Sequence, residues 1–406
     1  MSAPLDENTR AIVLATVPAL KAHGLAITTE MYKRLLATPA IRDLFNLSHQ
    51  QDGEQPKALA LAVLCYAEHI NDLGALGGMV ERIAEKHVGL NILPEHYPYV
   101  ATALLGAIGH VLGDAATPEI LDAWGKAYWF LADILIGREK QIYEGNEASP
   151  GGWTGWRAFR VRSRQRETST ITSFELIPED GGTLFRHKAG QYLSFKLDIP
   201  EHGSQRRNYS ISSSPGEDHY RISVRRQDGG VVSSWLHDSV KEGDILQVAN
   251  PAGDFFLNEE DSNPIVFLTA GVGLTPVISM LGELAQTRTN RSIRYVHGAD
   301  TEALAAFQPK IEEFAKDALL TADFFYSKEQ APTQNCLSGV TIHSGRITPA
   351  WVRQTLNRSA TYYICGPDSF MRDMVDALRT EKLPSAQIRY EFFGSAADPD
   401  LVLSAA

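Results

Sequence analysis

Roughly the first 140 residues place apolar side chains at the spacing of amphipathic helices. Gly24 is expected to end the first helix, and Thr38-Pro39 to end the next. No segment here alternates apolar and polar residues with a period of two, so the pattern predicts an all-α domain. The apolar stripes are Ile12, Val13, Val17 and Leu20; Leu59, Val63, Tyr66 and Ile70; Leu76, Val80, Ile83 and His87; and Leu121, Trp124, Tyr128 and Leu131.

The pattern changes after a stretch rich in glycine between Gly145 and Gly155, which is typical of an interdomain linker. Short β-type runs follow, separated by turn residues, and their spacing predicts a small antiparallel barrel. These runs are 159–162, 171–176, 192–197 and 220–224.

From about Pro264, strand-like runs alternate with helical segments, which predicts a parallel, doubly wound sheet. The predicted strands are 265–268, 293–297, 322–326 and 361–365, and the predicted helices include 277–287 and 370–380. The fold class is therefore multidomain: an all-α domain, an antiparallel β-barrel and an α/β parallel-sheet domain. The expected boundaries are 1–143 for the helical domain, 144–154 for the linker, 155–260 for the barrel and 261–406 for the α/β domain.

Composition narrows the classes of partner. The 406 residues carry a formal net charge of −11, which argues against nucleic acid or an anionic membrane surface as partner. The three cysteines are far apart in the sequence, so we expect neither a disulfide framework nor a Cys-x-x-Cys metal site. The N-terminus is polar, and with the cysteine usage this favours the cytoplasm. The uncharged run 264–281 is interrupted by Gly271, Gly273 and Pro276, so a strand, turn and helix are preferred to a membrane span.

The clearest motif is the run from Ala270 to Pro276, directly after a predicted buried strand. Glycines let the backbone approach a diphosphate, and the following helix offers free N–H groups and the positive end of its dipole. Pro276 suits a first helical turn, although it stands where the common dinucleotide motif has glycine. Taken alone, the run also fits a simple strand-to-helix turn.

Companion motifs strengthen the nucleotide reading. The run Arg207, Asn208, Tyr209 and Ser210 joins a guanidinium, an aromatic face and a hydroxyl, a set suited to a flavin and its phosphates, although a surface strand is the plainer alternative. Tyr192 lies upstream, and Gly230, Val232 and Ser233 lie downstream. Cys365, Gly366 and Pro367 lie at the end of a late strand, where a doubly wound fold binds its ligand.

With these motifs in this order, the chain resembles the ferredoxin-NADP⁺ reductase superfamily. The resemblance implies FAD on the barrel and NAD(P)H on the sheet domain. The residues assigned to these cofactors are Tyr192, Arg207, Asn208, Tyr209, Ser210, Gly230, Val232, Ser233, Gly271, Val272, Gly273, Leu274, Thr275, Pro276, Cys365, Gly366, Pro367, Glu391, Phe392, Phe393, Gly394 and Ser395. Ser395 replaces the proline of the family's Glu-x-Phe-Gly-Pro segment, and Phe392 is bulkier than usual there; Phe393 is still expected to cover the flavin.

His87 continues the apolar stripe of Val80 and Ile83, where a histidine is usually a satisfied core residue. The order of domains changes that reading, because a helical domain before such a reductase resembles the bacterial and fungal flavohemoglobins, in which a globin is fused to the reductase. Local runs carry the resemblance: 45–48, 83–87, 94–97, 121–128, 150–153 and 252–255.

The resemblance assigns roles in the helical domain. His87 is implied to be the proximal ligand of haem iron, in a hydrogen-bonded set with Tyr97 and Glu139 that favours O–O activation over O₂ carriage. Tyr32 is implied to be the distal hydrogen-bond donor. The other implied residues are Gln55 beside Tyr32, Leu59 over the iron, Phe45 against the porphyrin, and Lys86 with Glu391 in the gap between haem and flavin.

The implied activity is that of a nitric oxide dioxygenase: NAD(P)H reduces FAD, FAD reduces the haem iron, and NO and O₂ become nitrate. Three alternatives stay open at this point: an alkyl hydroperoxide or O₂ reductase, a haem-based sensor, and a ferredoxin-type reductase without haem. The resemblance favours NADH. The strand ending at His297–Asp300 is the region expected to meet the ribose 2′ position, and Arg291 and Arg294 near it do not decide between NADH and NADPH. It also allows a lipid in the distal haem pocket, and a monomer is expected.

Overall fold

The computed structural model describes residues 4–42, 44, 54–316, 320–331 and 339–393. The chain forms two compact units. The first contains Met1–Trp156 and the segment Lys196–Arg207, and the second contains Arg157–Phe195 and Asn208–Phe393.

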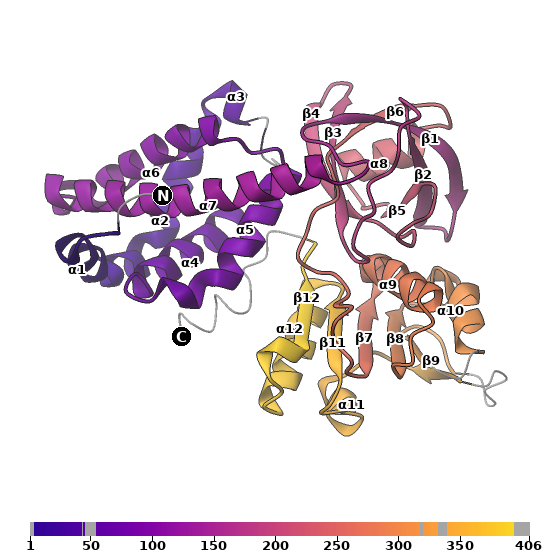
Figure 1. The fold of residues 1–406 in the computed structure, drawn as a ribbon. Coiled ribbons are helices and arrows are strands. Elements are labelled where there is room, and N and C mark those ends of the chain that lie inside the picture. The colour runs from indigo at the N-terminus through magenta and orange to yellow at the C-terminus, as the bar shows by residue number, and fades with distance from the viewer. Residues whose placement is uncertain (1–3, 43, 45–53, 317–319, 332–338, 394–406) are drawn as a thin grey trace. The chain divides into compact units, whose positions relative to one another are not determined.

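In its described residues, the segment 4–148 forms helices joined by turns and contains no strand, as the periodicity predicted (Figure 1). Its core is one cluster of buried aliphatic and aromatic side chains that includes Val13, Ile27 and Trp124. The helices are α1 (Glu7–Ala15), α2 (Val17–Leu36), α3 (Pro39–Arg42), α4 (Glu54–Glu68), α5 (Gly77–Gly89), α6 (Tyr97–Leu112) and α7 (Pro118–Ala148). Because α7 continues into the range expected for the linker, the domain boundaries stay a prediction.

Gly24 does not end a helix, and that expectation is wrong. Helix α2 passes through Gly24, which is buried, and ends at Leu36 just before Thr38-Pro39. A β-carbon on Gly24 would lie 3.6 Å from the β-carbon of Ala60 in α4. The two helices are also joined by the hydroxyl of Thr28, which donates to the carbonyl of Pro56 at 2.8 Å. Helix packing therefore overrides the local stop signal.

A six-stranded sheet in the order β4-β3-β6-β1-β2-β5 follows the helices along the chain. The pairs β1–β2, β1–β6 and β2–β5 are antiparallel, and a bridge between Ile211 and Ile222 joins the two end strands. The sheet therefore closes on itself, and the predicted barrel is confirmed. Its strands are β1 (Arg157–Arg166), β2 (Ile171–Pro178), β3 (Tyr192–Ile199), β4 (Gly203–Ser210), β5 (Tyr220–Arg225) and β6 (Ile245–Val248); helix α8 is Val231–Asp238.

The last part of the chain is a parallel sheet in the order β10-β9-β8-β7-β11-β12. Every neighbouring pair in it is parallel, which confirms the doubly wound expectation. Its strands are β7 (Ile265–Ala270), β8 (Ile293–Ala299), β9 (Leu320–Tyr326), β10 (Val340–Ser344), β11 (Thr361–Cys365) and β12 (Ile388–Glu391). Its helices are α9 (Thr275–Gln286), α10 (Gln308–Ala315), α11 (Pro349–Gln354) and α12 (Asp368–Thr380).

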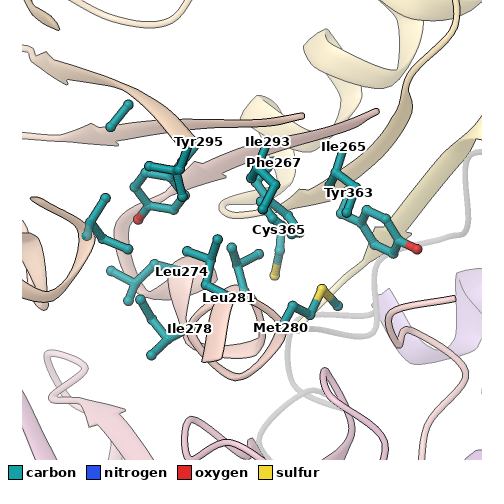
Figure 2. Close-up of a cluster of buried hydrophobic side chains, with 14 of the residues drawn as sticks. Ile265, Phe267, Leu274, Ile278, Met280, Leu281, Ile293, Tyr295, Tyr363 and Cys365 are labelled. Atoms are coloured by element: carbon teal, nitrogen blue, oxygen red, sulfur yellow. The ribbon is translucent and has the colours of Figure 1, made fainter. Parts of the chain in front are cut away.

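One face of this sheet packs on α9, whose residues from Thr275 to Leu284 are all buried. Figure 2 shows this core, in which Leu274, Ile278 and Leu281 meet Phe267 and Tyr295 of the strands. The uncharged run 264–281 is thus a strand, a short 3₁₀ turn and a helix. Among the described residues, no single helix has the length and apolarity to cross a membrane, although α1 and α2, bent by 67° at their junction, pass that test as a pair.

Gly24→Ala is expected to raise the melting temperature of the haem-bound protein by about 2–4 °C, because alanine is favoured inside a helix by about 1 kcal/mol. The added methyl would meet Ala60 at an ordinary contact distance. Thermal loss of the haem absorption band measures the change. A lower melting temperature would contradict this view of the α2–α4 contact.

Candidate functional site

His87 lies in the last turn of α5, on an apolar side of the helical unit. A small apolar cluster lies beside it: Tyr97 and Leu135 are buried in this cluster, and the half-buried Val80, Ile83 and Leu131 pack against it. The His87 side chain is itself 31% exposed. An imidazole is thus presented from a helix beside half-exposed apolar side chains, which is the chemistry that holds a haem.

The Nδ1 atom of His87 is held by two partners from other helices. It lies 2.7 Å from Oε1 of Glu139 in α7 and 3.1 Å from the hydroxyl of Tyr97 at the start of α6. The Tyr97 hydroxyl donates to the same Oε1 at 2.6 Å. The structure therefore brings together the three residues that the resemblance assigned to one set.

These contacts assign the tautomer of His87. A carboxylate can only accept, so the proton lies on Nδ1 and points at Glu139. The lone pair is then on Nε2, the atom free to bind a metal. Burial and the Glu139 carboxylate raise the pKa of Tyr97 above its ordinary value, so the phenol remains a donor.

The helices that carry this set are fastened to one another. Arg138 donates two hydrogen bonds of 2.7 Å to Glu81, joining α7 to α5 one residue before Glu139. The hydroxyl of Tyr128 donates to the Tyr97 carbonyl at 2.8 Å. Bidentate and interhelical bonds of this kind limit how far the His87 ring can turn.

The residues predicted for the opposite side of the haem come from α2 and α4. Tyr32 is half-buried in α2, and Gln55 and Leu59 are half-buried in α4. Thr28, one turn before Tyr32, bonds to the residue after Gln55. Burial raises the pKa of Tyr32 to about 12, so its hydroxyl keeps its proton at neutral pH. Phe45 lies outside the described residues.

The predicted flavin residues lie on a strand, β4, so the run is part of the barrel sheet. Arg207 is half-buried, Asn208 accepts a 2.8 Å hydrogen bond from Ser194, and the Tyr209 ring meets Phe195 edge-on at 5.7 Å. Ser210 is buried at the end of the strand. Tyr192 is buried, with its ring against Gly253.

A helix N-terminus completes the flavin candidates. Gly230 caps α8 with no side-chain hydrogen bond, so the first N–H groups of the helix can bind an anion. Ser233 accepts a hydrogen bond from the N–H of Gln227 at 3.0 Å, and Val232 is buried. A β-carbon on Gly230 would lie 2.7 Å from the Ser233 hydroxyl, which explains the glycine.

The glycine run after β7 has two distinct physical reasons. Gly271 has a left-handed backbone with φ of +54°, which favours glycine. At Gly273 a β-carbon would lie 2.2 Å from the carbonyl oxygen of Cys365, so the turn can lie against the end of β11 only without a side chain. Thr275 and Pro276 then open α9.

A cavity of about 380 Å³ lies at the carboxyl ends of the parallel strands, where open α/β sheets bind ligands. Of the predicted nucleotide residues, Gly271, Val272 and Pro367 line it. Gly273, Leu274, Thr275, Pro276, Cys365 and Gly366 are not in its wall, and most of them are buried behind it. Asp300, at the strand end expected to meet the ribose, also lines the cavity, whereas sequence reasoning missed other wall residues, among them Thr170, Arg225, Ser327, Arg346 and Phe370.

The C-terminal candidates are described only in part. Glu391 pairs with Cys365 across β12 and β11, and burial together with the Glu391 carboxylate raises the pKa of the Cys365 thiol. Phe392 is half-buried and Phe393 is 44% exposed. Lys86 is exposed on α5. Gly394 and Ser395 lie outside the described residues.

Three family models match successive parts of the chain: globin over residues 29–135, oxidoreductase FAD-binding domain over 159–257, and oxidoreductase NAD-binding domain over 267–376. A flavohemoprotein of Xylella fastidiosa is 45% identical over 396 residues, which are 97% of this chain and 98% of that one. One of Halalkalibacterium halodurans is 41% identical over 404 residues, with the same two shares. The chain belongs to the flavohemoprotein family.

Solved structures agree. The flavohemoglobin of Malassezia yamatoensis, which contains bound FAD and haem, matches with a TM-score of 0.85 and 28% identity over 97% of this chain and 100% of that one. The FAD/NAD-binding domain of a nitric oxide dioxygenase from Vibrio cholerae matches with a TM-score of 0.53 and 32% identity over 59% of this chain and 98% of that one.

Family membership confirms the predicted resemblance, fold class and cofactors: haem, FAD and a nicotinamide dinucleotide. The described residues fit each group. His87 offers a bare Nε2, the N-terminus of α8 offers N–H groups to a diphosphate, and the cavity beside Gly271 has the size of a ligand site.

Tyr97→Phe is expected to lower the free energy of unfolding by about 1.5–3 kcal/mol, because it removes a hydrogen bond to a buried carboxylate. Tyr143→Phe is the matched control, since the Tyr143 hydroxyl donates only to the Ile92 carbonyl. Denaturant titration of the haem-bound protein, followed by helical circular dichroism, compares them. Equal losses in the two variants would contradict a special place for Tyr97.

Proposed function

We propose that the chain is an NAD(P)H-dependent nitric oxide dioxygenase, which uses O₂ and electrons from the nicotinamide to convert NO into nitrate. The observation that carries this proposal is the pairing of His87 with a buried carboxylate in a chain that also has both reductase modules. A protein that only bound or sensed O₂ would not need its own supply of electrons. The name of the Vibrio cholerae relative supports the same activity.

When bound, the haem supplies a one-electron centre that takes O₂, and FAD splits the electron pair of a hydride into single electrons. The work of the helical unit is to orient the axial nitrogen. Glu139 accepts a hydrogen bond from Nδ1–H of His87 and so increases the electron donation from Nε2. Greater donation favours O–O bond chemistry over reversible O₂ carriage.

We assign Tyr32 as the distal donor. Its raised pKa keeps the phenol protonated, so it can donate a hydrogen bond to a ligand on the far side of the haem. Gln55 and Leu59 come from α4, the helix that Thr28 ties to α2. In this proposal Gln55 adds a second polar group, and Leu59 excludes water.

In the reductase, the turn Gly271–Leu274 and the first N–H groups of α9 bind the diphosphate of the nicotinamide dinucleotide. The Cys365 thiol and the Glu391 carboxylate are adjacent at the ends of β11 and β12. We assign them to the nicotinamide end. Arg207, Tyr209 and Ser210 of β4 bind the flavin, and Lys86 with Glu391 tunes electron transfer to the haem.

The test mixes the haem- and FAD-bound protein with the nicotinamide under N₂, then adds aerated NO solution while spectra are recorded and nitrate is assayed. Each NO oxidised to nitrate with O₂ needs one electron, so one nicotinamide should support two molecules of NO. Flavin bleaching, then haem reduction, then nitrate equal to the NO consumed is the expected result. Nicotinamide oxidation that does not depend on NO would instead favour an O₂ or hydroperoxide reductase. Flavin bleaching without haem reduction would favour a ferredoxin-type reductase that does not pass electrons to a haem.

Tyr32→Phe should speed the dissociation of O₂ from the ferrous protein by about 10–100-fold, the cost of a hydrogen bond worth about 1.5–3 kcal/mol. With the pKa of Tyr32 at about 12, the wild-type rate should stay constant as pH rises from 7 and increase only as the phenol starts to ionise. Stopped-flow O₂ release measures both effects. Tyr66→Phe is the control, because the Tyr66 hydroxyl donates to the Ala127 carbonyl; equal rates in the two variants would remove Tyr32 from the mechanism.

A further inference from the structure

The wall of the 380 Å³ cavity includes charged residues that have no role in the function proposed above. Asp300 and Arg346 line the cavity, as does Ser327, and Lys328 follows Ser327. They stand just beyond the carboxyl ends of β8, β9 and β10, which are neighbours in the sheet. The order of the strands therefore brings these residues, which are far apart in the sequence, together at the carboxyl edge of the sheet.

Asp300 is held in place from both sides. Its Oδ1 accepts a 2.9 Å hydrogen bond from the Ser327 hydroxyl, and its Oδ2 accepts one of 2.8 Å from Nζ of Lys328. The N–H of Lys328 donates to the Asp300 carbonyl at 2.8 Å. These bonds and the charge of Arg346 hold the pKa of Asp300 below its usual value, so the group is a carboxylate at neutral pH. Its side chain remains 46% exposed and can meet a ligand.

The two arginines that the sequence placed near the ribose site are occupied elsewhere. Arg291 is buried and donates to the carbonyls of Asn263 and Asn258. Arg294 pairs with Asp323 at 2.8 Å. Within the described part of the chain, the cations at this end of the cavity are therefore Arg346 and Lys328, while Arg225 lines it from β5.

The place of Asp300 indicates which part of a dinucleotide it meets. The diphosphate goes to the glycine turn after β7, and in doubly wound sheets an acidic residue at the end of the next strand reads the 2′-hydroxyl of the adenosine ribose. Here that next strand is β8, and Asp300 directly follows it. This step rests on the proposed use of a nicotinamide dinucleotide as reductant.

We propose that Asp300 selects NADH over NADPH, and that Lys328, Arg346 and Ser327 form a 2′-phosphate site that this one carboxylate closes. As a carboxylate, Asp300 accepts a hydrogen bond from a ribose 2′-hydroxyl and repels a 2′-phosphate. It also occupies Lys328 and Ser327, the groups that would otherwise bind the phosphate.

Removing the charge should therefore do more than weaken NADH binding. A freed lysine, an arginine and a hydroxyl are the donors that phosphate oxygens prefer. Two other carboxylates lie close by but are engaged: Glu329 accepts from the N–H of Glu302, and Glu302 accepts from Gln308. Within the described residues, Asp300 is the carboxylate that pairs with Lys328.

The test measures reduction of an artificial dye by the haem- and FAD-bound protein with NADH and with NADPH. We expect wild type to favour NADH by about 10–100-fold in kcat/KM. Asp300→Asn keeps the shape and an acceptor oxygen, so it should lower kcat/KM for NADH by only about 2–5-fold and raise that for NADPH by about 10-fold. In the double variant Asp300→Asn with Lys328→Met, the gain with NADPH should be lost.

A second readout needs no turnover. Calorimetry compares binding of adenosine 2′,5′-bisphosphate with that of AMP, which lacks the 2′-phosphate. Asp300→Asn should tighten binding of the bisphosphate about 10-fold and weaken binding of AMP, which has the 2′-hydroxyl, by about 2–5-fold, as for NADH. The gain in affinity of Asp300→Asn for the bisphosphate should become smaller as the salt concentration rises, because the gain depends on charges at an exposed site.

Asp373→Asn is the matched control, since Asp373 is another carboxylate in the wall of the same cavity. It belongs to α12, which follows β11, and β11 lies on the side of β7 opposite to β8. This variant should change kcat/KM for both nicotinamides by the same factor. The proposal would be overturned if the ratio of kcat/KM for NADPH to that for NADH in Asp300→Asn stayed within about 2-fold of the wild-type ratio, with unchanged binding of the bisphosphate. Dye reduction by neither nicotinamide would instead contradict the reductase itself.

Discussion

The structure of the helical unit depends on the burial of one carboxylate. Glu139 is only 2% exposed, and burying an unpaired charge costs several kcal/mol. Oxygen Oε1 accepts from Tyr97 and from His87, so the cost is offset only when α5, α6 and α7 are in their places. The packing of these helices and the orientation of His87 are therefore coupled. The hydrogen bonds that satisfy Glu139 hold Nδ1 of His87 toward Glu139 and Tyr97, and so leave Nε2 on the opposite side of the ring.

The reductase unit depends on a constraint of a different kind, the close approach of two backbones. The turn after β7 lies against the end of β11, where only Gly273 leaves room for the Cys365 carbonyl. That contact brings the N-terminus of α9 and the β11 end to one edge of the sheet. Asp300 and Arg346 lie at the same edge, so one feature of sheet geometry gathers both groups of residues that we propose bind the dinucleotide.

Long elements could be predicted from the sequence, because repeated apolar spacing is a strong local signal. Helix α7 and strands β7, β8, β9 and β11 were found in this way. The stop signal at Gly24 was misleading because packing against Ala60 carries the helix through it, and the four-residue strands β6 and β12 are too short to show a period. Arg207–Ser210 was recognised by its chemistry, and a strand, the alternative given for it, is the structure it adopts.

The site residues divide in the same way. The glycine turn is a local motif and could be read directly. Glu139 lies 52 residues from His87, so only resemblance pointed to it, and the structure supplies the contact. Asp300, Lys328 and Arg346 could not be joined from the sequence, because their meeting depends on the strand order β10-β9-β8-β7.

The measurement that tests the central claim most directly is the iron–histidine stretching frequency in the ferrous, ligand-free protein, recorded by resonance Raman for wild type and Glu139→Gln. If the Glu139 carboxylate makes His87 a stronger electron donor to the iron, the frequency must fall in the variant, because an amide oxygen accepts a weaker hydrogen bond from Nδ1–H. Tyr143→Phe should leave it unchanged. An identical frequency in wild type and Glu139→Gln would contradict the account.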